Sequence, residues 1–172
     1  MSERDVRGTA LSSVNPNDFR QAMSLLSQQV HLVTTIGSEG RFGVTVTAAA
    51  SVSDDPPTML FCVNRSSRSF PHFESAKTFC INTLTGSQQD IADAFAGRGQ
   101  LSIDDRFALG EWAELATGAP VLKTALAAFD CRLTHAIDMA THRVFFGEVE
   151  AVASGNDDTL ALAYRNRGYV SI

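Results

Sequence analysis

The chain has 172 residues, of which 44% are hydrophobic and 19% charged, and its net charge is −5 at pH 7. This size and composition are typical of one soluble globular domain that can form its core without disulfides or metals. The negative charge argues against nucleic acid or an anionic membrane as the main partner, and no run approaches the about 18 apolar residues of a membrane span.

The first 14 residues are polar, which predicts a flexible N-terminal arm before a single domain at residues 15–172. They lack the apolar core of a secretion signal, so we expect a cytoplasmic protein. Cys62, Cys80 and Cys131 are widely spaced without a CxxC pattern and are expected to be buried, reduced thiols. The four histidines are scattered, so no metal site is predicted.

In chain order, the first predicted element is a helix. Residues 15–18 combine cap residues with a proline, as helix starts do. Phe19, Met23, Leu26 and Val30 then recur at helical spacing. The pattern predicts one amphipathic helix whose apolar side chains lie in the core.

Strand patterns follow this helix. Residues 31–36 and 42–52 are rich in β-branched side chains and flank a turn at 37–40, which predicts a hairpin. Further strands are expected at residues 58–63, 78–84, 126–137, 143–152, 159–164 and 169–172, and helices at 69–75 and 87–96, the latter capped by Ser87. Residues 97–119 form a long irregular connection, typical of a lid or partner contact. Because βαβ units are missing, the order favours an antiparallel barrel with added helices.

Familiar nucleotide and catalytic motifs are absent from the sequence. It contains no GxGxxG after a strand, no phosphate-binding GxxxxGK[S/T], no GxSxG elbow and no HExxH. A Rossmann cofactor site, a P-loop and a serine or zinc hydrolase are therefore not predicted.

Two segments could bind a planar, phosphate-bearing ligand. Residues 43–53 are rich in small side chains, which let a flat ring approach the strand backbone and share its hydrogen-bonding groups; alternatively, they pack under a helix. Residues 62–69 end a strand in three hydroxyls and two guanidiniums before a short helix, a combination suited to an anion. The alternative there is a solvated loop with a helix cap.

Two smaller features lie further along the chain. His142, next to Thr141 at a break between strands, could orient a nicotinamide or the edge of a flavin, or could simply be a surface histidine. Arg106 and Phe107 lie in the long connection, with Trp112 beyond them, and could cover a planar ligand or form an ordinary salt-bridged loop.

Taken together, these segments resemble the short-chain flavin reductases, the small reductase components of two-component flavin monooxygenases. The resemblance extends over nearly the whole chain. It is carried by residues 19–23, 33–35, 43–53, 55–58, 62–65, 80–84, 95–97, 106–107, 120–122, 129–132 and 141–142. Ala140 departs from the family pattern, because most relatives have glycine at that position.

The resemblance implies a mainly β fold with helices, a split β-barrel that binds FMN and forms a homodimer. It implies a flavin reductase that passes a hydride from NADH or NADPH to flavin N5, with FMN as the flavin and FAD as a possible substitute. Reduced flavin or its electrons would then pass to a partner monooxygenase. The family pattern makes His142 the catalytic candidate. It places flavin contacts at Thr47, Ala48, Ser51, Val52, Ser53, Asn64, Ser66, Ser67, Ser69, Arg106, Phe107 and Tyr169.

Other readings of the same resemblance stay open. One keeps the flavin and makes a corrinoid cobalt the acceptor, as in cobalamin synthesis. Another is a non-enzymatic flavin- or haem-binding module on the same barrel, because a fold alone does not define an activity. The third is a dimer without a ligand.

Overall fold

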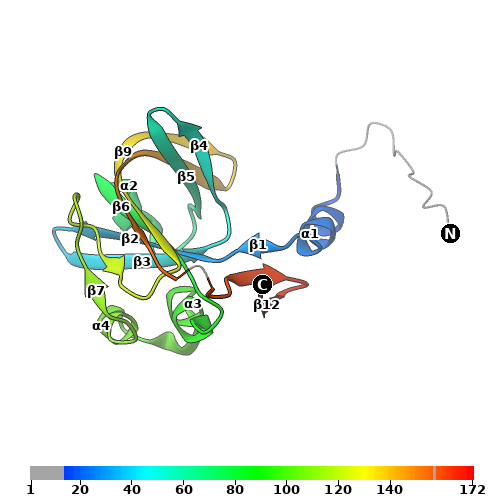
Figure 1. The fold of residues 1–172 in the computed structure, drawn as a ribbon. Helices are drawn as coiled ribbons and strands as arrows, with labels where there is room; N and C mark the ends of the chain where they lie inside the picture. The colour runs from blue at the N-terminus through cyan, green and yellow to red at the C-terminus, as the bar shows by residue number, and fades with distance from the viewer. Residues whose placement is uncertain (1–13, 157) are drawn as a thin grey trace.

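The computed structural model describes residues 14–156 and 158–172, so the predicted arm at residues 1–14 lies outside the described residues except for Val14. The described chain is mainly β with added helices (Figure 1). Its strands are β1 (Gln28–Gln29), β2 (His31–Gly37), β3 (Gly40–Val46), β4 (Ala49–Asp54), β5 (Pro57–Asn64), β6 (Thr78–Thr83), β7 (Trp112–Ala113), β8 (Val121–Leu122), β9 (Ala127–Met139), β10 (His142–Ser154), β11 (Leu162–Arg165) and β12 (Gly168–Ser171). Its helices are α1 (Pro16–Ser24), α2 (Phe70–Glu74), α3 (Gln89–Phe95), α4 (Ile103–Phe107) and the 3₁₀ helix η1 (Arg98–Gln100).

Seven strands form one antiparallel sheet in the order β3-β2-β6-β9-β10-β5-β4. Strands β3 and β4 are consecutive in the chain but lie at opposite edges of this sheet, so the sheet curves round an interior (Figure 1). The single strand predicted at residues 42–52 is therefore wrong. It is broken at Thr47 and Ala48, where the chain leaves β2 to pair with β5.

The interior of the curved sheet holds an aromatic core. The ring centroid of Phe61 lies 4.7 Å from that of Phe79 and 4.9 Å from that of Phe145. Helix α2 closes one end with Phe73, whose centroid lies 5.6 Å from that of Phe61. All four rings are at most 1% exposed, and burying each contributes about 1.5–3 kcal/mol.

A second core cluster lies on the other face of β2. Leu32 packs there with Phe95 of α3, Phe107 of α4 and Leu122 of β8. The hydroxyl of Thr45 on β3 donates to the backbone carbonyl of Ala92 on α3, at 2.7 Å. Helix α3 is thereby fixed against β3.

The first helix differs from the prediction in length and in packing. It ends at Ser24 instead of continuing to Val30, because the chain becomes extended and β1 pairs with β11. Val30 is fully buried, but Phe19 and Leu26 are 58% and 52% exposed. Helix α1 stands away from the curved sheet (Figure 1), so the core role predicted for its side chains is wrong. No helix within residues 14–156 or 158–172 is long and apolar enough to span a membrane.

The segment predicted to be irregular, residues 97–119, is instead ordered. It contains η1, α4 and β7. The hydroxyl of Ser102 caps α4 by accepting from the backbone N–H of Asp105, at 3.1 Å, and the indole of Trp112 donates to the Phe107 carbonyl at 2.7 Å. The buried carboxylate of Asp130 accepts the backbone N–H of Thr117 at 2.8 Å. These local bonds order a stretch that has no hydrophobic periodicity.

Two smaller predictions also need correction. Ser87 does not cap α3; Gln88 stands at the cap position, and its side-chain oxygen accepts the backbone N–H of Thr85 at 2.9 Å. Cys80 and Cys131 are buried and free as predicted, whereas Cys62 is only partly buried. The reason is that Cys62 points to the outer side of β5, between the inward-facing Phe61 and Val63.

Candidate functional site

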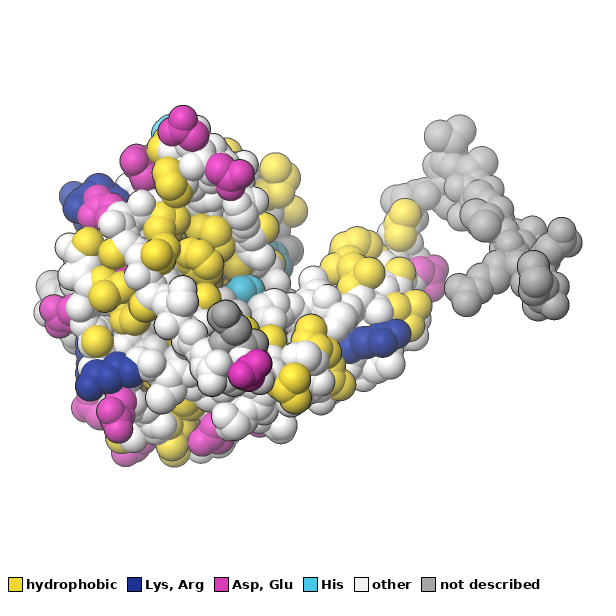
Figure 2. Space-filling model, viewed as in Figure 1, with side chains coloured by type: hydrophobic (Ala, Val, Ile, Leu, Met, Phe, Trp, Pro, Cys, Tyr) yellow, Lys and Arg dark blue, Asp and Glu magenta, His cyan; other side chains and the backbone are white. Residues whose placement is uncertain are grey.

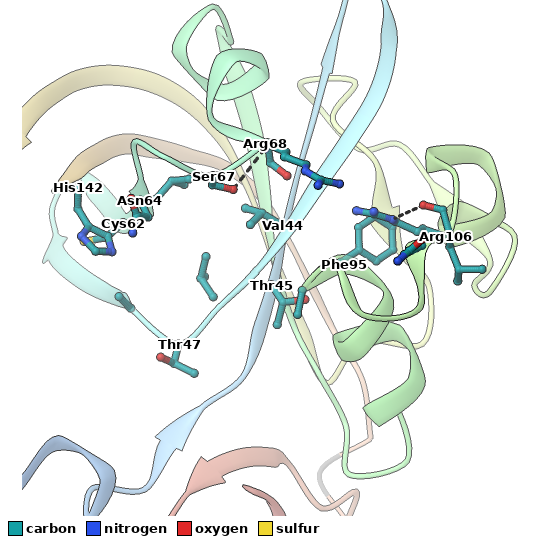
Figure 3. Close-up of a pocket in the computed structure, with 18 residues that line it drawn as sticks. Val44, Thr45, Thr47, Cys62, Asn64, Ser67, Arg68, Phe95, Arg106 and His142 are labelled. Atoms are coloured by element: carbon teal, nitrogen blue, oxygen red, sulfur yellow. Dashed lines mark hydrogen bonds between the residues drawn. The ribbon is translucent and has the colours of Figure 1, made fainter. Parts of the chain in front are cut away.

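A pocket of about 1000 Å³ opens where the chain passes from β3, at one edge of the sheet, to β4, at the other edge. A volume of this size is at the upper end of ligand sites for small molecules. Figure 3 shows His142, Asn64 and Cys62 at one side of the pocket and Arg68 and Arg106 at the other. The pocket is lined by Val44, Thr45, Val46, Thr47, Ala48, Cys62, Val63, Asn64, Ser67, Arg68, Ser69, Phe95, Ala96, Gly97, Gln100, Leu101, Arg106 and His142.

The Thr47–Ala48 link forms one wall with its backbone. Both residues lie outside the strand ladders. The carbonyl of Ala48 accepts the backbone N–H of Cys62 at 2.9 Å. Ala48 is exposed and its side chain is a single methyl, so a flat ring can approach the main chain closely here.

A second wall follows β5 and carries hydroxyls and a guanidinium. Asn64 orders this turn, because its side-chain oxygen accepts the backbone N–H of Ser66 at 2.9 Å and the Ser66 hydroxyl at 2.8 Å. Ser67, Arg68 and Ser69 then line the pocket. Neutral hydroxyls beside a guanidinium are suited to binding a phosphate group.

The third wall comes from α3, η1 and α4. The backbone turns sharply after α3, with φ of +85° at Gly97, +80° at Gly99 and +54° at Gln100. Arg106 of α4 is held by a 3.1 Å bond from its Nε to the carbonyl of Leu101. Arg106 lines the pocket at the same side as Arg68 (Figure 3).

His142 lies at the start of β10, next to a two-residue turn. Its Nδ1 lies 2.9 Å from the hydroxyl of Thr141, and its backbone is paired with Asn64 of β5. Ala140 adopts φ +49° in this turn, a conformation that favours glycine. A glycine at this position would adopt that conformation without strain.

The chemistry of the pocket is that of binding and orientation. Cys62 is its thiol, and burial raises the pKa of that thiol, so it is neutral at pH 7. No group of three or more His, Cys, Asp or Glu side chains that could hold a metal ion occurs within residues 14–156 and 158–172. The pocket offers backbone, hydroxyl, amide, imidazole and guanidinium groups to a ligand.

The structure brings seven of the predicted site residues together in this pocket. They are Thr47, Ala48, Asn64, Ser67, Ser69, Arg106 and His142. Residues Ser51, Val52 and Ser53 lie further along β4, outside the pocket lining.

Three further predicted residues point elsewhere in this structure. The Ser66 side chain is bonded to Asn64. Phe107 is 2% exposed and packs against Phe95 and Trp112. Tyr169 on β12 packs edge-on against Tyr164, with centroids 5.4 Å apart, and does not line the pocket.

Sequence reasoning missed the wall formed by α3 and η1, which contributes Phe95, Gly97, Gln100 and Leu101. One signal could have indicated it. The spacing of Gly97 and Gly99 on either side of Arg98 is typical of a sharp bend, and such a bend directly after a helix often borders a site.

Comparison with protein families and curated proteins gives consistent matches. The family model described as "Flavin reductase like domain" matches residues 23–172. The chain is 46% identical over 159 residues to "FMN reductase (NADH) RutF 2" of Methylorubrum extorquens, covering 91% of this chain and 90% of that protein. It is 41% identical over 157 residues to "FMN reductase (NADH) RutF" of Yersinia enterocolitica, covering 91% and 85%.

Solved structures agree with these matches. BorF, the flavin reductase component of a bacterial two-component tryptophan halogenase, superposes with a TM-score of 0.82 at 28% identity, covering 92% of this chain and 98% of that one. The flavin reductase HpaC complexed with NADP⁺ superposes with a TM-score of 0.80 at 26% identity, covering 91% and 97%. The fold and most of the chain length are shared with both.

Proposed function

The chain belongs to the family of flavin reductase like domains, and from this premise we propose that it is an NADH-dependent FMN reductase whose site is the pocket between β3 and β5. The observation that carries the proposal is the joining, in one cavity, of an accessible backbone link at Thr47–Ala48 with two guanidiniums. The relatives named above are FMN reductases that use NADH, which favours FMN over FAD and NADH over NADPH.

The residues of the pocket fit a flavin mononucleotide. Such a molecule has a flat ring, a polyhydroxyl chain and a terminal phosphate. The Thr47–Ala48 backbone is suited to the ring, and the hydroxyls of Ser67 and Ser69 with Arg68 and Arg106 are suited to the phosphate end. The pocket volume of about 1000 Å³ leaves room for a nicotinamide beside the ring.

The task of the protein in this reaction is placement. When bound, FMN would supply the ring that takes up a hydride from the nicotinamide. The chain's own residues hold the two rings in contact, which converts a chance encounter into an oriented one. His142 borders the end of the pocket away from Arg106, and its proposed role is to orient the nicotinamide.

A homodimer is part of the proposal, because the outer side of the sheet carries an exposed apolar face. We call this the outer apolar face: Ala50 of β4, Leu60 of β5, Ile137 of β9, and Val144 and Phe146 of β10. The strand registers place these residues side by side, and Ile137 is 51% exposed. Antiparallel sheets normally present polar side chains to solvent, so we infer that this apolar face is covered by another molecule.

A second copy of the chain is the partner that fits. Cys62 and His142 belong to the same side of the sheet and also line the pocket, so the outer apolar face continues into the proposed site. The exposed apolar side chains of α1 add a further surface on the part that stands apart from the sheet (Figure 2). Flavin would then bind at or beside the subunit interface.

The architecture that we propose is a split β-barrel formed by residues 15–172 as one domain. Support comes from the family match over residues 23–172. It also comes from the sheet order, in which the consecutive strands β3 and β4 form the two opposite edges. Reduced flavin would pass to a partner monooxygenase; the support is that BorF is itself the flavin reductase component of a two-component enzyme, a tryptophan halogenase.

Anaerobic mixing tests the proposed activity. Purified protein with FMN should lose the visible absorbance of oxidised flavin when NADH is added. Protein with FMN but without NADH is the control. Persistence of the oxidised spectrum after NADH addition would show that the reductase proposal is wrong.

A further inference from the structure

An ion cluster lies at the end of the β9–β10 hairpin, with Arg143 at its centre. The Arg143 guanidinium donates to both carboxylate oxygens of Asp138, with Nη2–Oδ2 at 3.0 Å. Its Nη1 donates to Glu74 of α2 at 2.9 Å. The guanidinium carbon lies 5.2 Å from the ring centroid of Phe70, and the Arg143 side chain is 20% exposed. The arginine is therefore held by three neighbouring side chains.

Asp138 also connects to the neighbouring wall of the pocket. Nη2 of Arg65 lies 3.9 Å from its Oδ2. The backbone N–H of Arg65 donates to the carbonyl of Thr141 at 2.9 Å. The hydrogen bonds from Arg143 hold the pKa of Asp138 below its usual range, so the carboxylate keeps its charge. The cluster thus joins the hairpin end to the Asn64–Ser69 segment and to α2.

Little else fixes this hairpin end. Residues 134–142 are all exposed, and the turn contains Ala140 in a left-handed conformation. Beyond the ladder with β5, which ends at the His142–Asn64 pair, the turn is linked to the body of the protein by the backbone bond from Arg65 to Thr141 and by the ion cluster. The cluster joins the hairpin end, which carries His142, to the segment after β5, which begins at Asn64. Both residues lie at the same side of the pocket (Figure 3).

We propose that Arg143, Asp138 and Glu74 are positioning residues, which hold the hairpin end that carries His142 against the Asn64–Ser69 segment at one side of the pocket. The proposal rests on the flavin reductase function argued above. Loss of the cluster would let the hairpin end move, and a displacement of about 1 Å at a reacting pair can cost about 100-fold in rate. None of the three residues lines the pocket, so their effect passes through the residues that do.

The same hairpin offers a matched control. Arg132 of β9 and Glu150 of β10 form a similar two-bond ion pair, with Nη2–Oε2 at 2.9 Å. This pair lies on the same two strands but away from the turn, and neither residue lines the pocket. Its loss should leave the site unchanged.

The kinetic experiment compares four single variants with the wild type. Arg143→Met and Asp138→Asn should lower kcat/KM for NADH about tenfold, and Arg143→Lys should lose less because it keeps the charge. Arg132→Met should match the wild type. The double variant Arg143→Met/Asp138→Asn should lose less than the two single losses combined, because both single variants break the Arg143–Asp138 link.

Hydrogen exchange in the flavin-free protein supplies a readout independent of activity. In Arg143→Met the amide of Arg65, which is bonded to Thr141, should exchange faster, while the amide of the buried Val33 on β2 keeps its wild-type rate. A uniform acceleration in every strand would mean general destabilisation and would overturn the positioning role.

The outcomes separate the two proposals. A wild type that reduces FMN, together with Arg143→Met and Asp138→Asn variants as active as Arg132→Met, overturns the positioning role alone. A wild type that leaves FMN oxidised overturns the reductase function and the positioning role with it. Slower Arg143 and Asp138 variants with faster exchange confined to the Arg65 region support the inference.

Discussion

At the scale of single residues, His31 shows how burial changes the chemistry of a side chain. It lies on β2, is 8% exposed, and its Nδ1 is 3.1 Å from the hydroxyl of Thr83. Burial lowers its pKa from 6.5 to about 4, because the charged form would lose its hydration. His31 is therefore neutral in the folded protein at pH 7, and it is a structural residue outside the pocket lining.

Acid should destabilise the protein partly through His31. The unfolded chain binds a proton at His31 below about pH 6.5, whereas the folded chain resists it until about pH 4. The stability due to neutral His31 is thus complete above pH 6.5 and declines as the pH falls towards 4. Because one pKa unit corresponds to about 1.4 kcal/mol, the loss is at most roughly 3.5 kcal/mol.

Urea unfolding at several pH values checks this expectation. His31→Gln keeps a polar side chain that does not titrate, so its free energy of unfolding should decline less between pH 6.5 and 4 than that of the wild type. The carboxylates are the same in both proteins, so their contribution to the pH dependence of stability cancels in the comparison. Equal slopes in the two proteins would contradict the assignment.

The small side chain of Ala48 keeps the pocket open beside the Thr47–Ala48 backbone, so its size should affect the affinity for FMN. Ala48→Leu places a branched side chain over the backbone link that we propose to contact the flavin ring. We expect the Kd for FMN to rise about tenfold, which is about 1.4 kcal/mol. Quenching of flavin fluorescence on titration measures it. The control is Ala116→Leu, an exposed alanine outside the pocket lining; equal affinities in the two variants would show that the ring lies elsewhere.

At the scale of elements, the strands with simple alternation were predictable and the interruptions were not. Strands β2, β5 and β6 coincide closely with their predicted ranges, because local apolar and β-branched patterns define them. The break between β3 and β4 was not predictable, because Thr47 and Ala48 have no turn chemistry of their own. The chain leaves β3 there because β5 offers a second edge to pair with.

The same distinction applies to the candidate site. The walls at residues 47–48 and 64–69 have recognisable composition and were found in the sequence. The wall at α3 and η1 depends on how α3 packs against β3 through Thr45 and Phe95, a contact between segments about 50 residues apart. Likewise, the amphipathic spacing of α1 predicted a core helix, but the helix has no buried residue and stands apart from the sheet (Figure 1).

Gly43 connects this packing to the pocket. A Cβ at residue 43 would lie 2.7 Å from Cε1 of Phe95, which lines the pocket, and 3.3 Å from Cδ1 of Leu32. Gly43→Ala should therefore push α3 away from β3, lower the free energy of unfolding by about 1–3 kcal/mol and weaken FMN binding at the same time.

Gly37, in the β2–β3 hairpin that also holds Gly43, provides the comparison for that variant. A Cβ at Gly37 meets nothing within 4 Å, so Gly37→Ala should change stability by no more than about 0.5 kcal/mol and leave FMN affinity unchanged. Chemical unfolding and flavin titration of both variants give the result. If Gly43→Ala behaves like Gly37→Ala, then α3 is not packed on β3 as described.

At the scale of the whole molecule, the two faces of the curved sheet have different roles. The inner face is filled by the aromatic core around Phe61, and the outer side of β2 is covered by α3 and α4. The outer side of β5, β9 and β10 carries the outer apolar face and no element of this chain within residues 14–156 and 158–172 packs across it. The proposed second copy would bury that face and complete the surroundings of His142.

Ile137 tests the dimer directly, because it is 51% exposed and lies within the outer apolar face. The wild type should sediment as a dimer, and Ile137→Asp should shift it towards monomer, since an unpaired carboxylate is costly to bury in an interface. Leu160→Asp is the matched control: Leu160 is 59% exposed but lies between β10 and β11, outside that face. Because the face continues into the pocket, Ile137→Asp should also weaken FMN binding, with recovery at high protein concentration as the dimer reforms. A wild type that stays monomeric over the whole dilution series would refute the second copy as the partner of this face.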